Sequence, residues 1–447
     1  MMGFSARPTR GPAIREPPPD LPDRRRSPAP KGWPLVALVA AAVGVRLVVI
    51  AAGPDRLDDH DRYLSLARSL AAGRGFALDG RATAYRPPLY PILLAPMVGL
   101  LPDPALPWGV AGLHLTLGGG TVALVGWTAR RWGLGPRRAL VAAAVAAFDP
   151  VLVVQARSVM TETPAAFLVA ATLAALTAPG LGGATCSGIG FGLAALCRPS
   201  LLPWAVATAC AGLVVGPGGR KARVARGAAL ILATAATLAP WAARNASIFG
   251  EPVWTTTHGG YTLALANNPA YYADVLDGPP GAVWSGANQD AWFAAVSRST
   301  AGMREPEADR ALRASALAMA RERPSEFARA SIARLGRFWG VAPAGAVYPA
   351  TVRAACAAWT VPLWVGLVVG LARPGCWRWP GVAAVAGLAS LSLVHLLYWT
   401  DLRMRAPIVP AIALIVAGAS PFSRRFPSPG PAAGTAKAVA PVVSGGK

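Results

Sequence analysis

Charged side chains are scarce in this chain. Asp, Glu, Lys and Arg make up 14% of its 447 residues, whereas hydrophobic residues make up 54% and the mean hydropathy is +0.42. Soluble domains of this size do not reach such a value, so an assembly of soluble domains is excluded. The apolar runs are long enough to cross a bilayer and are continuous rather than alternating, which predicts membrane-spanning helices and not a β-barrel.

Cysteine, histidine and acidic residues are also few. The five cysteines lie in or beside apolar segments without CxxC or Cys/His spacing, and the four histidines are dispersed, so we assign no metal ligand among them. The 21 acidic residues stand against 43 Lys and Arg, which gives a net charge of +22. The basic residues form short clusters between apolar runs without interleaved aromatic residues, which argues against nucleic acid as a partner.

Apolar segments recur along the chain and predict about ten spanning helices. The first lies too far from Met1 for an ordinary signal peptide and has no A-x-A-like site after it, so we expect an uncleaved span. A further segment, 87–102, is short and proline-rich, and we expect a re-entrant or surface helix there. The predicted spans are 34–53, 107–129, 139–156, 163–178, 182–197, 199–216, 227–243, 354–372, 380–399 and 406–420.

The basic clusters give the expected orientation. When the spans are threaded from a cytoplasmic N-terminus, the short basic connections fall on the cytoplasmic side, as the positive-inside rule requires. Both termini are then cytoplasmic, and we expect a multi-pass protein of the inner or plasma membrane. The clusters are Arg130/Arg131/Arg137/Arg138, Arg220/Lys221/Arg223/Arg226, Arg373/Arg378 and Arg424/Arg425.

This topology predicts five regions. Their ranges are a disordered basic cytoplasmic tail at 1–33, an N-terminal transmembrane catalytic module at 34–243 with a first outer loop at 54–106, an outer loop domain at 244–353, C-terminal transmembrane helices at 354–420, and a disordered cytoplasmic tail at 421–447. The first outer loop should hold a short amphipathic helix from Asp59 to Leu70, ended by Gly73 and Gly75. The outer loop domain should be mainly helical, with two helices separated at Pro324.

Polar residues gather on the expected outer side, where the candidate chemistry lies. Ionisable residues at membrane depth are costly, so their clustering is a functional hypothesis. A carboxylate can take the proton of an attacking hydroxyl, and arginines can bind a phosphate and stabilise it as it leaves. The alternative for each arginine is an interfacial anchor, and for Asp58 and Asp61 a solvated loop charge. The residues are Asp58, Asp59, Asp61, Glu162, Arg198, Arg244, Asn245, Asp401, Arg403 and Arg405.

Four stretches, in order, resemble the lipid-carrier-dependent glycosyltransferases of the GT-C superfamily. These are the bacterial relatives of protein O-mannosyltransferases and of the aminoarabinose transferase that modifies lipid A. The stretches are DDHDRYLSLARSLAAGRGF with AYRPPLYPILLAP, then RSVMTETPAAFLV, then PWAARNASIFGEPVWTTTHGGYTLALANNP, and finally DLRMRAPIVP. The resemblance implies an all-α integral membrane fold: a GT-C-type polytopic bundle with outer-face juxtamembrane helices and a mainly helical outer loop domain.

The resemblance also implies roles for individual residues. Asp59, four residues before Tyr63, takes the position of the family's essential aspartate and is the expected general base, with Glu162 at the second acidic position. His60 replaces the usual acidic partner and Met404 replaces a tyrosine, which weakens the case for a metal held by paired carboxylates. The expected binders of the donor phosphate are Arg198, Arg244, Arg403 and Arg405. Further candidates for substrate binding are Asp58, Asp61, Tyr63, Arg86, Asn267 and Asn268.

The expected activity is that of a membrane glycosyltransferase. It would move a sugar from a polyprenyl-phosphate donor to a hydroxyl of an outer-face acceptor, which could be a lipid, a protein or a cell-envelope glycan. No cofactor is assigned, and a divalent cation (Mg²⁺ or Mn²⁺) stays an open alternative. The alternative activity is a transporter or flippase of lipid-linked saccharides, for which an inverted repeat is typical; we detect none. Trp284, Trp292, Tyr271 and Tyr272 could stack on sugars or simply pack.

Overall fold

The structure is a computed structural model that describes residues 32–52, 59–278, 282, 284–345 and 348–419. The two tails that we expect to be disordered lie almost wholly outside the described residues, as do Asp58 and the basic pair Arg424/Arg425. The described residues are almost entirely helical, with one two-stranded antiparallel hairpin of β1 (Ala77–Leu78) and β2 (Arg81–Ala82). The predicted all-α fold is therefore confirmed.

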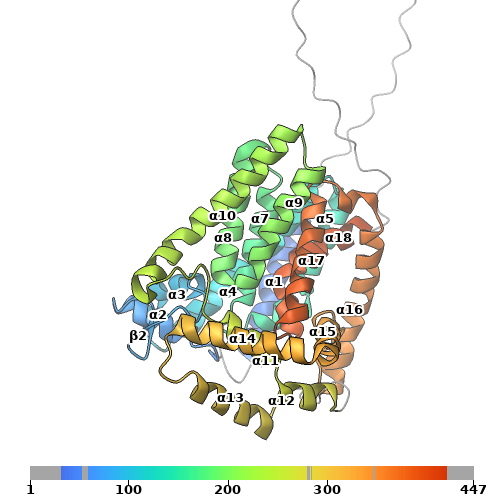
Figure 1. The fold of residues 1–447 in the computed structure, drawn as a ribbon. Coiled ribbons are helices and arrows are strands. Elements are labelled where there is room, and N and C mark those ends of the chain that lie inside the picture. The colour runs from blue at the N-terminus through green and yellow to red at the C-terminus, as the bar shows by residue number, and fades with distance from the viewer. Residues whose placement is uncertain (1–31, 53–58, 279–281, 283, 346–347, 420–447) are drawn as a thin grey trace, which may run out of the picture.

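Long apolar helices form the bundle in Figure 1. Six segments of the described chain are long and apolar enough to cross a membrane: α1 (Trp33–Ala52), α4 (Leu106–Arg131), α8 (Gly180–Cys197), α10 (Arg220–Phe249), α16 (Ala350–Leu371) and Leu402–Ala419, which comprises η4 (Leu402–Ile408) and α18 (Val409–Ala419). Shorter apolar helices accompany them: α3 (Leu89–Leu100), α7 (Glu162–Ala175), η1 (Pro199–Leu201) with α9 (Leu202–Val215), and α17 (Gly381–Leu397). This is a multi-pass membrane protein.

The predicted single span at 139–156 is wrong. The structure has two helices there, α5 (Pro136–Phe148) and α6 (Pro150–Gln155), separated at Asp149. Pro150 cannot donate a backbone hydrogen bond, and the Asp149 side chain accepts hydrogen bonds from the backbone N–H groups of Val151 and Leu152. On the other side of the break, the buried Arg46 guanidinium donates to the carbonyls of Ala146 and Ala147 at 3.1 and 2.8 Å. The break is therefore a stable, hydrogen-bonded feature.

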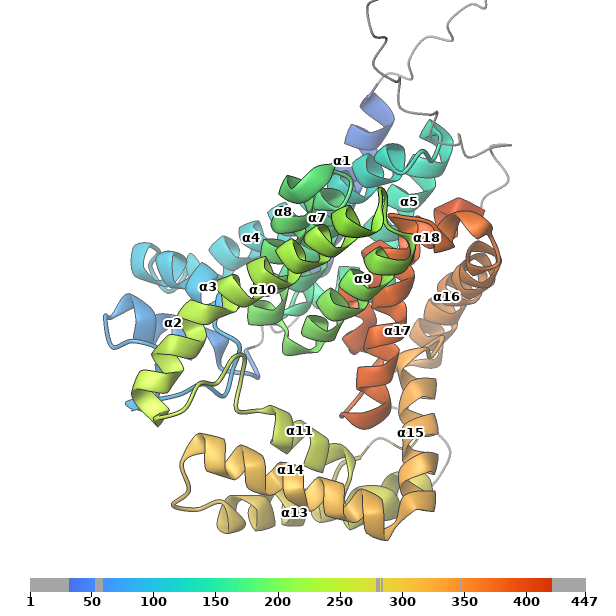
Figure 2. The same ribbon diagram turned by 45° about the horizontal axis from the view of Figure 1, so that its top comes forward.

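A layer of shorter elements covers one end of the bundle, which we call the loop end. It includes α2 (Tyr63–Ala71), the β1–β2 hairpin and α3 from the first loop. The long loop adds α11 (Gly259–Ala266), α12 (Pro269–Tyr271), η2 (Tyr272–Leu276), α13 (Ala287–Ser299), α14 (Glu305–Glu322) and α15 (Pro324–Phe338). Figures 1 and 2 show α11, α13 and α14 running across this end. Segments far apart in sequence thus meet at one end of the bundle.

The opposite end, which we call the basic end, holds the connections α4–α5, α7–α8, α9–α10 and α16–α17. Arg138 interacts electrostatically with Arg373, so two of the predicted basic clusters lie near each other. Trp379, in the α16–α17 connection, packs against Gly212 at the end of α9. The basic connections therefore gather at the end of the molecule that is remote from the two large loops.

Small residues let the helices approach closely. A Cβ atom at Gly188 of α8 would lie 2.3 Å from the backbone oxygen of Leu230 in α10. A Cβ at Gly387 of α17 would lie 2.2 Å from the ring of Trp204 in α9. Packing through such small residues is typical of membrane helices, because lipid supplies no hydrophobic force between them.

Candidate functional site

Asp59 lies at the start of α2, and its carboxylate accepts two backbone hydrogen bonds. The N–H of Tyr63 donates to Oδ1 at 2.7 Å and the N–H of Leu64 to Oδ2 at 2.9 Å. Burial raises the pKa of Asp59 to about 6, and this effect outweighs the lowering by the two hydrogen bonds. The predicted base is therefore held rigidly, remains partly accessible, and titrates close to neutrality.

Asp61 pairs with an arginine of the following loop. Arg86 Nη2 lies 2.7 Å from Asp61 Oδ1, and the two side chains are 20% and 23% exposed. The guanidinium carbon of Arg86 lies 5.3 Å from the centre of the Tyr85 ring, within range of a cation–π contact. The two halves of the first loop are thus joined by one partly accessible ion pair.

Glu162 lies in the interior of the same end, as the first residue of α7. Its side chain is 1% exposed, and Arg198 Nη1 lies 3.0 Å from Oε1. Arg403 Nε lies 3.9 Å from the same oxygen. Neither carboxylate oxygen of Glu162 makes a hydrogen bond of good geometry. Two arginines from distant parts of the chain therefore converge on one carboxylate without saturating it.

The Asp61–Arg86 pair and the group around Glu162 form one charged cluster. It consists of Asp61, Arg86, Glu162, Arg198 and Arg403. Arg403 interacts electrostatically with Asp61 as well as with Glu162 and Asp401. Asp59 adjoins the cluster, because it interacts with Asp61. Tyr63 is buried beside it and makes an edge-on contact with Tyr90, with ring centres 5.4 Å apart. The structure thus brings together residues from the first loop, α7, the end of α8 and η4.

Arg198 and Arg403 are each anchored by a second contact. Arg198 Nη1 donates to Thr161 Oγ1 at 3.1 Å, and its Nη2 contacts the sulfur of Met404. Arg403 Nε donates to Asp401 at 3.1 Å, and the Arg403 side chain is 35% exposed. Met404, which departs from the tyrosine of the family pattern, therefore contributes to positioning Arg198.

The structure does not bring Arg244 and Arg405 into this cluster. Arg244 donates to the carbonyls of Thr83 and Phe76 at 2.7 and 2.8 Å and so attaches α10 to the β1–β2 hairpin. Arg405 is buried, donates to the carbonyl of Gly340, and lies 4.8 Å from the ring of Trp364. Backbone carbonyls already occupy both guanidinium groups, so we leave these two predicted phosphate binders out of the site.

Asn267 and Asn268 hold the layer at the loop end together. Asn267 Nδ2 donates to the carbonyl of Leu397 at 2.9 Å, and its Oδ1 accepts from Arg334 at 3.1 Å. Asn268 Oδ1 accepts from the N–H of Tyr271 at 2.8 Å and caps α12. Both side chains are buried, and their contacts join α11 and α12 to α15 and α17.

An aromatic wall lies beside Arg86, and of its members the reasoning from sequence named Trp292 alone. It consists of Tyr85, His258, Tyr261 and Trp292, with successive ring centres 4.3, 5.1 and 5.8 Å apart. Burial, with a smaller contribution from Arg86, lowers the pKa of His258, so its imidazole is neutral near pH 7. The Tyr-Arg-Pro-Pro and His-Gly-Gly-Tyr stretches were the available signal. Tyr271, Tyr272 and Trp284, by contrast, are buried packing residues.

Glu305, the first residue of α14, joins the long loop to the first loop beside this wall. Its Oε2 accepts hydrogen bonds from the N–H of Ala84 at 2.8 Å and from Thr257 Oγ1 at 2.9 Å. The N–H of Thr257 in turn donates to the carbonyl of Ala84 at 3.0 Å. The long loop is therefore attached directly to the residues that precede Tyr85 and Arg86.

Within the described residues, no group of three or more His, Cys, Asp or Glu side chains is placed to hold a metal ion. Asp61, beside Asp59, is paired with Arg86. Among the described residues, the side chains near Asp59 therefore do not form a set of ligands that fits a divalent cation.

Comparisons with known proteins bear on the family and the fold of this chain. Residues 97–196, which include Glu162, match the family model of dolichyl-phosphate-mannose-protein mannosyltransferases. No curated protein matches the chain. The predicted resemblance to GT-C glycosyltransferases is confirmed over this segment.

A solved structure shares the fold, and others are similar to it. The oligosaccharyltransferase of Archaeoglobus fulgidus, tethered with an acceptor peptide that contains the NVT sequon, superposes with a TM-score of 0.52 at 13% identity, over 87% of this chain and 49% of that one. A second structure of that archaeal enzyme, AglB in complex with an inhibitory peptide and a dolichol-phosphate, gives 0.48 at 15% identity over 86% and 50%. ArnT from Cupriavidus metallidurans, bound to undecaprenyl phosphate, gives 0.41 at 16% over 88% and 78%. This chain spans about half the length of the oligosaccharyltransferase.

Proposed function

Because residues 97–196 match the mannosyltransferase family model and the fold is shared with an oligosaccharyltransferase, we propose that this protein is a membrane glycosyltransferase. It moves a sugar from a polyprenyl-phosphate donor to a hydroxyl of an acceptor. The observation that carries the proposal is the charged cluster, in which three arginines and two carboxylates meet beside Asp59 at the loop end.

Arg86, Arg198 and Arg403 bind the donor phosphate in this proposal. Their side chains are 20%, 12% and 35% exposed, so each retains contact with the space outside the protein. Guanidinium groups form paired, charge-assisted hydrogen bonds to phosphate oxygens. The same hydrogen bonds stabilise the charge that develops on the phosphate when the bond to the sugar breaks.

Asp59 is the general base. Its Oδ atom takes the proton of the acceptor hydroxyl while the hydroxyl oxygen attacks the anomeric carbon of the donor. The bond from that carbon to the phosphate oxygen breaks, the electron pair stays on the polyprenyl phosphate, and the anomeric configuration inverts. A base with a pKa near 6 is mostly ionised at neutral pH and still accepts a proton readily.

The aromatic wall is the proposed contact for sugar. Tyr85, Tyr261 and Trp292 are each partly exposed, and aromatic rings of this kind stack on the apolar faces of sugars. Arg86 links the wall to the charged cluster, since it contacts both Tyr85 and Asp61. A donor with its phosphate on Arg86 would therefore hold its sugar beside the wall.

The proposed location is the cell membrane, with the loop end on the outer side. The connections at the basic end carry the clusters around Arg130, Arg220 and Arg373, which favours a cytoplasmic position for that end. The N- and C-termini are then cytoplasmic, and the acceptor is an outer-face hydroxyl.

Substitution of Asp59 by Asn tests the proposal. The measurement is transfer of radiolabelled sugar from synthetic polyprenyl-phosphate sugars to acceptors in membranes that contain the protein. We expect D59N to insert normally and to lose transfer by roughly 10²- to 10⁴-fold, the usual contribution of a general base.

The matched control is Asp79→Asn. Asp79 belongs to the same loop but forms an exposed ion pair with Arg62 at 2.6 Å and is not a member of the cluster. It should retain transfer. Full activity of D59N, or equal loss in both variants, would overturn the role of Asp59.

A further inference from the structure

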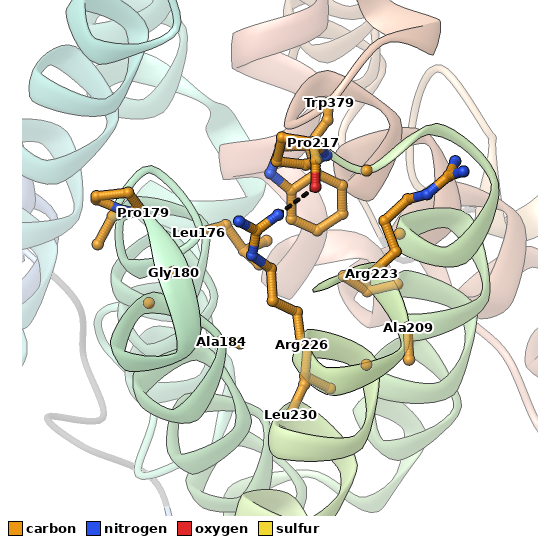
Figure 3. Close-up of a pocket in the computed structure, with 16 residues that line it drawn as sticks. Leu176, Pro179, Gly180, Ala184, Ala209, Pro217, Arg223, Arg226, Leu230 and Trp379 are labelled. Atoms are coloured by element: carbon orange, nitrogen blue, oxygen red, sulfur yellow. Dashed lines mark hydrogen bonds between the residues drawn. The ribbon is translucent and has the colours of Figure 1, made fainter. Parts of the chain in front are cut away.

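A cavity of about 160 Å³ lies at the basic end, far from the charged cluster. It is bounded by the α7–α8 turn, the last turns of α9, the first turns of α10, and Trp379 (Figure 3). Its walls are mainly apolar, and much of the lining is glycine: Gly180, Gly183, Gly212, Gly216 and Gly227. The small residues leave room between helices that otherwise pack closely.

One polar side chain in the cavity wall lacks a partner. Thr208 is fully buried and lines the cavity, and its Oγ1 makes no hydrogen bond in the described structure. Threonines in apolar helices usually donate to the carbonyl four residues earlier, as Thr172 and Thr234 do here. An unpaired buried hydroxyl costs free energy, so Thr208 indicates a polar group that enters the cavity.

Two arginines of α10 border the cavity. Arg226 reaches across it and donates to the carbonyl of Pro217 (Figure 3), and Arg223 Nη1 donates to the carbonyl of Val214. The Nε atom of Arg223 is buried and has no hydrogen-bond partner. The arginines therefore retain donors for a further acceptor.

No acidic residue of the surrounding sequence compensates these charges. Residues 163–250, which contain α8, α9 and α10, include neither Asp nor Glu, and neither do residues 350–400 around Trp379. Arg220 and Lys221 add two further positive charges at the start of α10. An anionic group at the cavity would thus meet uncompensated positive charge.

We propose that this cavity binds one anionic phospholipid. Its phosphate lies on Arg223 and Arg226, a glycerol-ester oxygen accepts from Thr208 Oγ1, and the start of an acyl chain enters the glycine-lined space. Basic pockets between membrane helices are typical sites for anionic headgroups. The apolar lining favours a lipid over free phosphate. This proposal does not depend on the glycosyltransferase activity.

Native mass spectrometry of the detergent-solubilised protein tests the site. The probes are phosphatidylglycerol, phosphatidylcholine and inorganic phosphate, each added separately. We expect one phosphatidylglycerol to be retained, and at least tenfold less occupancy in the double variant Arg223→Gln/Arg226→Gln. The control is Arg130→Gln/Arg131→Gln, which removes two exposed arginines at the same end and should leave occupancy unchanged.

A steric variant tests the acyl-chain part. A Cβ at Gly227 would make only ordinary contact, 3.7 Å from the Leu213 side chain, so Gly227→Leu should fold and fill the cavity. Gly44→Leu, at an exposed helix position with open space, is the matched control. Loss of phosphatidylglycerol in G227L but not in G44L supports the proposal. Equal retention of both phospholipids, unchanged retention in either cavity variant, or equal thermal stabilisation by phosphate alone would overturn it.

Discussion

Arg46 and Arg198 are both arginines placed against helix ends within the bundle, yet their surroundings differ. Arg46 is 1% exposed, and its guanidinium donates to three backbone carbonyls, those of Ala42, Ala146 and Ala147. Arg198 is more accessible and meets Glu162, whose two carboxylate oxygens lack hydrogen bonds of good geometry. Backbone carbonyls of the protein accept the hydrogen bonds of the Arg46 guanidinium. Arg198, by contrast, lies beside a carboxylate whose oxygens remain without hydrogen bonds of good geometry.

The same contrast separates two arginines of one motif. Arg405 is buried against the carbonyl of Gly340 and the ring of Trp364, whereas Arg403 is 35% exposed beside Glu162. Asp149 interacts electrostatically with both Arg46 and Arg405, which makes these three a closed group. A buried charge whose donors are all occupied supports the fold, and one with spare donors near a carboxylate is suited to bind a ligand.

The largest expected effect is a loss of stability on substitution within the closed group of Arg46, Asp149 and Arg405. Arg405→Gln should lower the free energy of unfolding by about 3–5 kcal/mol, because it leaves buried polar groups without a charged partner. Thermal unfolding in detergent measures this loss. The donor KM and kcat per folded molecule should stay near wild type. A normal unfolding temperature with lost transfer would instead place Arg405 in the site.

Arg403→Gln should have the opposite profile. Loss of charge-assisted hydrogen bonds to the donor phosphate costs about 1.5–3 kcal/mol, which corresponds to roughly 10- to 100-fold in kcat/KM. The unfolding temperature should change little, because the side chain is a third exposed. Arg403→Lys should restore part of the activity, since it restores the charge. An R403Q enzyme with normal kinetics would contradict the distinction between the two groups.

Glu162→Gln should produce a smaller change that appears mainly in one kinetic constant. Glu162 touches Arg198 and Arg403, so we treat it as a positioning residue for the two phosphate binders. The donor KM should rise about tenfold while kcat changes less, because a misplaced arginine costs about 1.4 kcal/mol for each tenfold loss in binding. Steady-state kinetics with varied donor concentration separates the two constants. An effect confined to kcat would make Glu162 a catalytic residue.

The dependence on pH should be the mildest effect. The pKa of Asp59 is raised to about 6, so the carboxyl becomes protonated below that pH and can no longer accept a proton. We expect kcat/KM to fall about tenfold per pH unit below pH 6. The neutral form is favoured in the folded state, so the stability contributed by Asp59 is largest at low pH and is lost as pH rises through about 6. Mild acid should therefore inactivate the enzyme without unfolding it through this residue.

A comparison of two variants checks that assignment. D61N should keep the acidic limb of the pH profile and raise the donor KM, because Asp61 orients Arg86. D59N should remove the limb along with most of the activity. If the acidic limb of the kcat/KM profile disappeared in D61N rather than in D59N, Asp61 would be the base.

Sequence reasoning located most of the apolar helices of the bundle, because long apolar runs are plain in the sequence. It failed at Asp149, although Asp149 followed by Pro150 is a local signal for a helix start; the support that Arg46 gives this break from another helix could not be predicted. It could not separate Arg403 from Arg405. These residues lie two apart in a 3₁₀ helix with three residues per turn, so their side chains point to different sides.

The site shows a similar division. The threaded topology placed Asp59, Glu162 and Arg403 on the same side of the membrane. The order of the motifs therefore predicted that they would lie at one end of the bundle. The pairing of Asp61 with Arg86 depends on how the first loop folds back on itself. The contact of Tyr85 with His258 depends on how this loop meets the long loop and joins residues more than 170 positions apart, for which local pattern carries no signal.

The short helix α5 has a consequence for how the protein is made. Its 13 residues extend only about 20 Å at 1.5 Å per residue, less than the roughly 30 Å of the bilayer core. It packs against α4 and against α18, the final described helix of the chain. Because α18 (Val409–Ala419) lies far downstream of α5 in the sequence, it is synthesised long after α5. During synthesis, α5 therefore lacks one of the helices it packs against until α18 has been made.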